Sequence, residues 1–177
     1  MATNLELITS QAIPYNVSNV DITNVFSDKY DKYKVVISGV TTIGTTATSC
    51  QLRVIQSDGS VRSTLSYAYG YRQLKGNTTY AEQRATNATE INRVAVADKP
   101  DAGNCVMYIY QPYDSATYTF FAWQVSNYFN SNLEGIKGIA YSGVAETITG
   151  FRFQEIATSP FSGGQISVYG VRVWVVH

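Results

Sequence analysis

Apolar and polar residues alternate over residues 33–38 (YKVVIS), where every second residue from Tyr33 to Ile37 is apolar. A period of two is the pattern of a β-strand with one buried face. A polar segment that contains Tyr30 leads into this stretch, and Gly39 follows it. The pattern therefore predicts a half-buried strand that ends at the glycine.

Aromatic and β-branched residues gather in further short runs, which are bounded by Gly, Pro, Asn, Asp and Ser. Residues 57–60 (SDGS) form one such boundary, and their central Asp-Gly predicts a turn from which residues 61–71 return. No window of helical length has apolar residues at i, i+3, i+4 and i+7, so we expect at most one short helix. The other predicted strands are residues 50–56, 90–96, 105–110, 117–123, 135–141, 146–150, 151–156 and 166–176.

Many short strands separated by turn signals predict an all-β fold, an antiparallel β-sandwich of jelly-roll type. A chain of 177 residues suits one hydrophobic core, and neither a linker nor an internal repeat divides it. We therefore expect residues 1–177 to form a single domain. Composition agrees, because the chain has 14 tyrosines and 13 glycines whereas Lys, Glu and Leu, the usual helix formers, are scarce.

Charge is low and balanced, with 15% charged residues and a formal net charge of zero. Phosphate binding requires clustered Lys and Arg, so the composition argues against nucleic acid as a partner. A charge-poor surface also favours association of the protein with itself or with a larger body. No apolar run approaches the roughly 20 residues of a membrane span, and no signal peptide is recognisable, so no membrane partner is expected.

Residues that carry chemistry are few. His177 is the only histidine, and a histidine at a mobile chain end is a poor basis for a catalytic triad or a metal site. Asp98, Asp101 and Asn104 could offer oxygen ligands to calcium, but their spacing matches no EF-hand and suits an ordinary turn. We therefore expect no metal site and no cofactor.

Carboxylates and thiols give no catalytic motif either. The glutamates that could act as an acid and base pair on a sugar are scattered along the chain, without a motif that would pair two of them. We therefore expect no enzyme. Cys50 and Cys105 could form a disulfide, although two small buried thiols is the interpretation that we favour. The scattered glutamates are Glu82, Glu90, Glu134, Glu146 and Glu155.

Tyrosine supplies the best candidates for recognition. Alternation places Tyr67, Tyr69 and Tyr71 on one side of a strand, where exposed rings could stack on a sugar or anchor a protein interface. The same three rings would equally suit a core or a subunit interface, which we favour over ligand binding. Trp174 is a further candidate, because both faces of the final strand are apolar near its end, as in a strand buried on two sides or one that meets another chain.

Three segments, in this order, resemble the small β-sandwich domains of tailed-bacteriophage virion proteins, such as tail-fibre and minor structural proteins. Residues 7–40 carry a Ser-containing strand, a Phe, and a Tyr-x-x-Tyr that leads into a strand. Residues 105–124 contain two strands around a short turn with a proline, and residues 148–174 contain a Phe-bearing strand, a Gly-rich turn and a final strand with Tyr-Gly. The chain departs from such domains by starting at Met1 rather than following a fibre and by extending to VRVWVVH.

The resemblance implies a protein of the virion that has no catalytic residues. Our leading expectation is a non-enzymatic accessory block that decorates or cements the capsid by packing between subunits, with other capsid or tail proteins as partners. The resemblance also implies a homo-oligomer, a trimer. The alternative is the receptor-binding tip of a tail fibre or head appendage, which would recognise host glycan through Tyr67, Tyr69, Tyr71 and the polar residues 72–104.

Overall fold

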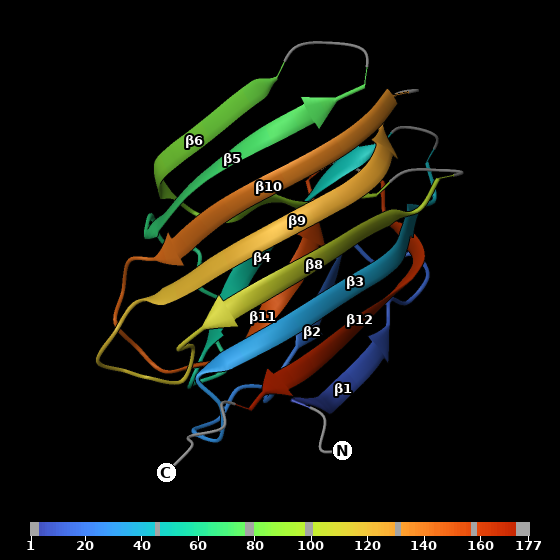
Figure 1. Cartoon of the computed structure of the whole chain (residues 1–177). Helices are drawn as coiled ribbons and strands as arrows, with labels where there is room; N and C mark the ends of the chain where they lie inside the picture. Colours follow the sequence, from blue (N-terminus) through green and yellow to red (C-terminus); the bar gives the residue numbers. More distant parts are fainter. Residues whose placement is uncertain are drawn as a thin grey trace.

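The computed structural model describes residues 4–44, 47–76, 80–97, 101–129 (for residue 129, the backbone alone), 132–156 and 159–172. These residues form strands and no helix (Figure 1). The strands are β1 (Leu5–Ala12), β2 (Asn19–Ile22), β3 (Lys32–Thr42), β4 (Thr48–Gln56), β5 (Tyr67–Lys75), β6 (Ala81–Ala88), β7 (Ile91–Ala97), β8 (Gly103–Tyr110), β9 (Thr119–Phe129), β10 (Asn132–Ser142), β11 (Ile148–Glu155) and β12 (Phe161–Val171).

The strands lie in two antiparallel sheets that pack face to face. The larger sheet has eight strands in the order β1-β12-β3-β8-β9-β10-β5-β6, and the smaller has four in the order β2-β11-β4-β7. Figure 1 shows the larger sheet in front and the smaller one behind its central and lower strands. The all-β antiparallel sandwich predicted from the sequence is confirmed.

Eight of these strands form nested pairs, in which β1 pairs with β12, β2 with β11, β3 with β8, and β4 with β7. This nesting is compatible with the predicted jelly-roll type. The hairpin β5-β6 is inserted between β4 and β7, and the hairpin β9-β10 between β8 and β11. Both insertions extend the larger sheet at one side, so this sheet is twice as wide as its partner.

Strand β3 shows how the alternating pattern becomes structure. Tyr33, Val35 and Ile37 are fully buried between the sheets. The strand does not end at Gly39, because this glycine adopts a φ of 67° and the pairing with β8 shifts between Ile37 and Val40. A glycine at positive φ allows a bulge without steric cost, so the strand continues to Thr42.

Predicted elements after residue 56 are partly wrong. Residues 57–60 form the expected turn, in which Ser60 N donates to the Asp58 carboxylate at 2.9 Å. Residues 61–71, however, do not return along β4: Val61 alone forms a bridge with Ile55, and the chain then crosses to the larger sheet, where β5 starts at Tyr67. A turn motif fixes the local reversal but not the sheet that the next strand joins.

Other differences concern the bounds of strands. The segments 146–150 and 151–156 form one strand, β11, and the final strand starts earlier than expected, at Phe161. The polar strand β6, the N-terminal strand β1 and the short strand β2 were not among the strands predicted from alternation. The end of the predicted strand over 166–176, including Trp174, lies outside the described residues.

Aromatic rings and aliphatic side chains fill the space between the sheets. Phe153 of β11 stacks on Phe161 of β12 with ring centroids 5.3 Å apart, which joins the smaller sheet to the larger. Cys50 and Cys105 are buried free thiols, as favoured from the sequence. Burial raises the pKa of both thiols, since the charged form loses its hydration.

The inserted strands are held from the inner side of the larger sheet. Trp123 of β9 lies flat against Gly138 of β10, where a Cβ atom would come within 2.2 Å of the indole ring. Its indole N–H donates to the Arg93 carbonyl of β7 at 3.1 Å. The Arg93 guanidinium in turn pairs with the buried carboxylate of Glu134 at 3.1 Å. These contacts fix the inner face of β9 and β10 against the smaller sheet. They therefore determine which side chains of the two strands point outward.

Candidate ligand-binding groove

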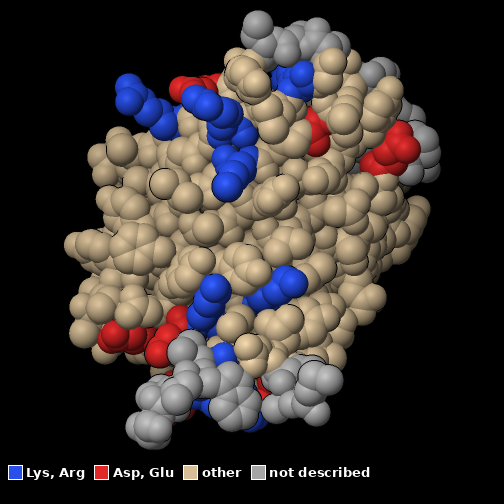
Figure 2. All heavy atoms as spheres, in the orientation of Figure 1, with Lys and Arg blue, Asp and Glu red and all other residues tan. Residues whose placement is uncertain are grey.

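The outer face of the eight-stranded sheet is the face turned away from the smaller sheet, and it is unusually apolar. In Figure 2 a broad uncharged band separates two groups of basic side chains on this side of the molecule. Contiguous exposed apolar surface commonly marks an interaction site. Nine of the fifteen large apolar side chains that are exposed among the described residues lie on this face: Leu5, Leu7, Leu74, Val106, Phe120, Tyr128, Leu133, Ile139 and Tyr141.

A row of aromatic residues crosses three neighbouring strands of this face. Tyr110 of β8 pairs with Phe120 of β9, and Phe120 pairs with Tyr141 of β10. The Phe120 and Tyr141 ring centroids are 6.1 Å apart, and the Tyr118 ring stacks on Tyr141 at 5.8 Å. The Phe120 side chain is 47% exposed, so part of this row is open to a ligand.

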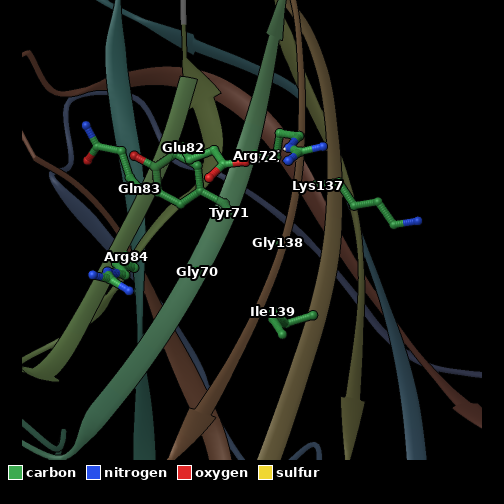
Figure 3. Close-up of a pocket in the computed structure, with 9 residues that line it drawn as sticks. All are labelled: Gly70, Tyr71, Arg72, Glu82, Gln83, Arg84, Lys137, Gly138 and Ile139. Carbon is green, nitrogen blue, oxygen red and sulfur yellow. Dashed lines mark hydrogen bonds and ion pairs between the residues drawn. The ribbon is translucent and has the colours of Figure 1, made fainter. Parts of the chain in front are cut away.

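The next row along the strands has a small residue on either side of the exposed Ile139, and the surface is low at these two positions. Ile139 of β10 pairs with Ala122 of β9 on one side and with Gly70 of β5 on the other, and Gly70 pairs with Arg84 of β6. A Cβ atom at Gly70 would meet nothing nearer than the Gln83 carbonyl oxygen at 3.9 Å. The surface is therefore hollow above Gly70, and Figure 3 shows its ribbon bare between Arg84 and Ile139.

A third row is polar. Lys137 of β10 pairs with Arg72 of β5 and with Gln124 of β9, and Arg72 pairs with Glu82 of β6. The Arg72 guanidinium forms an ion pair with the Glu82 carboxylate, and this bond raises the pKa of Arg72. In Figure 3 Lys137 extends freely from β10.

Together the three rows form a shallow depression, which we call the transverse groove because it crosses the strands. The aromatic row is one wall, and the polar row is the other. The row with Gly70 and Ala122 is the floor, and the Ile139 side chain projects from it between them. Two adjoining hollows of about 440 and 580 Å³ make up the groove and share Gly70, Arg84 and Ile139. The groove therefore offers a ligand apolar rings on one side and hydrogen-bond donors on the other.

Positive charge without an ion-pair partner gathers on the same face. Lys32 lies over the rings of Tyr108 and Tyr110, with its ammonium 4.5 Å and 5.4 Å from their centroids. Among the described residues, five Lys and Arg side chains form no ion pair: Lys32, Lys34, Lys75, Arg84 and Lys137. Four of them lie on the outer face, and the fifth, Lys75, lies at the end of β5 outside the groove.

Of the site residues predicted from the sequence, the three tyrosines of β5 share one face as expected, and that face is the inner one. Tyr67 is fully buried, and its hydroxyl oxygen accepts a hydrogen bond from Val54 N at 2.9 Å. Burial raises the pKa of Tyr67 to about 12. Tyr69 is half-buried and stacks on the buried Tyr71 at 6.2 Å. These rings join the two sheets, while Trp174 lies outside the described residues.

Acidic residues form no metal-binding cluster in the described parts of the chain. No group of three or more His, Cys, Asp and Glu side chains there is placed to hold a metal ion. Asn104, considered above for calcium, accepts a hydrogen bond from Gly39 N at 3.1 Å, and Asp98 lies outside the described residues. Four of the five glutamates considered above form ion pairs with arginines: Glu82 with Arg72, Glu90 with Arg53, Glu134 with Arg93, and Glu146 with Arg62.

A membrane-spanning helix is also absent from the described segments, which contain no helix of the required length and apolarity.

The groove residues were missed because strand register is not visible in the sequence. In residues 119–129 (TFFAWQVSNYF) apolar side chains occur on both faces of one strand, which is a usable signal of a second contact surface. It would have identified Phe120 and Ala122. Arg84 and Lys137 carry no such signal, because they reach the groove only through the pairing of β6, β5 and β10.

Comparison with known proteins gives little. No known family model matches the chain, and no curated protein matches it. Among solved structures, the chain is similar to the CBM2 module of the evolved Dit protein of Lactobacillus casei BL23 phage J-1. The two share 10% identity with a TM-score of 0.23, over 93% of this chain and 70% of that chain.

Proposed function

We propose that the protein is a non-enzymatic surface protein of a tailed-phage virion and that it binds host glycan in the transverse groove. The observation that carries the binding role is the aromatic row of Tyr110, Phe120 and Tyr141 beside a floor of small residues. The virion context is supported by the ordered sequence segments that resemble tailed-phage structural domains. No catalytic role is assigned to any residue.

The chemistry of the two walls suits a sugar. Sugar rings have apolar C–H faces that pack on aromatic rings, and tyrosine provides large contact area at low entropic cost. Sugar hydroxyls need hydrogen-bond partners when they leave water, and the Lys137 ammonium lies along the opposite wall. Each wall therefore matches one part of the same ligand.

A second candidate function is the accessory block expected from the sequence, a homotrimer that cements other virion subunits. The extent of the outer face favours it. Seven strand spacings of about 4.8 Å and about eight residues per strand at about 3.4 Å each give a face of about 900 Å². A stable interface buries about 800 Å² per partner. Leu5, Leu7 and Leu133 are exposed on this face away from the groove floor and would contribute to such packing.

Glycan arrays with two variants distinguish these functions. Gly70→Leu places a large side chain over the groove floor, where a Cβ atom meets nothing nearer than 3.9 Å, so we expect glycan binding to be lost while the urea midpoint of unfolding does not fall. Leu7→Ser changes the outer face far from the groove and should leave glycan binding intact. Glycan binding that survives Gly70→Leu would exclude the groove as the site. An absence of glycan binding, together with attachment to phage particles that Leu7→Ser weakens, would establish the accessory function instead.

A further inference from the structure

We infer that the ligand of the transverse groove is an acidic polysaccharide, a chain of sugars that carry carboxylates. This inference rests on the proposed glycan-binding function and names the class of glycan. It follows from the distribution of charge on the outer face, where the cations without an acidic partner are placed along the groove and at its end.

Arg84 and Lys137 are the two cations that line the groove without an ion pair among the described residues. Glu82 is the one acidic residue that lines the two hollows, and its carboxylate is already engaged by Arg72. A neutral sugar would leave both positive charges without a counter-charge. A carboxylate bound beside either of them gains a charge-assisted hydrogen bond, which is about twice as strong as a neutral one.

The floor row extends this charge beyond the two hollows. Continuing from Ala122, the pairing runs through Tyr108 of β8 to Lys34 of β3. Arg84 and Lys34 thus belong to one row and are separated by five strand spacings, or about 24 Å. A ligand that contacts both is a polymer rather than a single sugar.

Charge also argues against a second copy of the protein lying face to face on the groove. A symmetric pair would bring the same patch of both copies together, so the cations Lys34, Arg84 and Lys137 would lie against a surface that carries the same three cations. Like charges across an interface are strongly unfavourable. An acidic protein segment would satisfy the charge, but it lacks the regular apolar ring faces that suit the wall formed by Tyr110, Phe120 and Tyr141.

Affinity measurements with defined polymers test the inference. Polygalacturonate, alginate and hyaluronan serve as acidic probes, dextran and cellohexaose as neutral probes, and poly-glutamate as the peptide probe. We expect at least one acidic polysaccharide to bind, with affinity that falls as salt rises, and the neutral probes to bind at least tenfold more weakly. Lys137→Gln and Arg84→Gln should each weaken binding about tenfold. Lys75→Gln removes the same charge outside the groove and should have no effect.

The alternative outcomes separate the inference from the function on which it rests. Equal binding of neutral and acidic polysaccharides, abolished by Gly70→Leu but unaffected by Lys137→Gln, would keep the glycan function and overturn the acidic ligand. Poly-glutamate binding more tightly than any polysaccharide would replace the glycan by an acidic protein partner. Failure of every polymer on the array and in this panel would overturn both proposals.

Discussion

Phe120 and Phe121 are neighbours on β9, and they have opposite environments. Phe121 is 2% exposed and faces the smaller sheet, whereas Phe120 is 47% exposed on the outer face. The same contrast holds for tyrosine, because Tyr67 is buried on the inner face and Tyr141 lies in the aromatic wall of the groove. Residue type therefore does not separate core from binding surface in this protein. A residue belongs to the core when the smaller sheet covers its side of the strand, and to the binding surface when nothing in the described parts of the chain covers that side.

The largest expected difference between the two faces is in stability. Phe121→Ala should lower the free energy of unfolding by about 3–5 kcal/mol, because it removes a buried ring and leaves a cavity. Phe120→Ala should change it by less than about 1 kcal/mol, since the ring is already half in water. Urea denaturation of the two variants measures both values. Similar losses for both would mean that the outer face is covered in solution.

Glycines sharpen the same comparison. Gly138→Ala places a methyl group 2.2 Å from the Trp123 ring, so we expect overpacking to cost about 1–3 kcal/mol. Gly70→Ala points into the open groove and should be neutral or slightly stabilising, by up to about 1 kcal/mol, because it restricts the unfolded chain. Thermal unfolding of the pair provides the measurement. A neutral Gly138→Ala would show that Trp123 can move away from β10.

Hydroxyl groups give a third contrast. Tyr67→Phe removes the acceptor of the Val54 N–H and leaves that buried donor unsatisfied, which should cost about 1–3 kcal/mol. Tyr141→Phe removes an exposed hydroxyl and should leave stability within about 0.5 kcal/mol. Equal urea midpoints for the two variants would contradict the buried hydrogen bond.

Alkaline pH should produce the most gradual effect. The pKa of Tyr67 is raised from 10.0 to about 12 by burial, so above pH 10 the unfolded chain loses this proton while the folded chain keeps it. The unfolded state then binds fewer protons, and the free energy of unfolding falls between pH 10 and 12, by at most about 1.4 kcal/mol per pH unit from this group. Below pH 10 Tyr67 keeps its proton in both the folded and the unfolded state, so its titration does not change stability there. Urea midpoints between about pH 9 and 12 measure this slope, which should be shallower in Tyr67→Phe.

Alternation and turn residues predicted most of the central strands, because the period of two is set by local geometry. They gave β4, β7 and β8 closely, gave β3 up to its bulge at Gly39, and identified the all-β sandwich. They failed where the outcome depends on partners distant in sequence. The crossing of residues 61–66 to the other sheet, and so the burial of Tyr67, depends on how the sheets close.

The candidate site was harder to predict than the fold for the same reason. Its aromatic wall comes from three strands, and its cations without an ion pair come from β6 and β10. The polar strand β6 looks like a loop in the sequence, since its eight residues contain no large apolar side chain. Only pairing with β5 places Arg84 beside Gly70 and thus at the floor of the groove.

The two inserted hairpins have a consequence for how this fold can diversify. The floor of the groove and most of its walls lie on the hairpin strands β5, β6, β9 and β10. Among the described residues, Tyr110 of β8 is the one groove residue on a strand of the nested pairs that close the sandwich. Outward-facing residues on the hairpins can therefore be exchanged without disturbing the pairs that hold the sheets together. We expect related chains to share the nested frame and to differ in ligand through the outer side chains of these four strands.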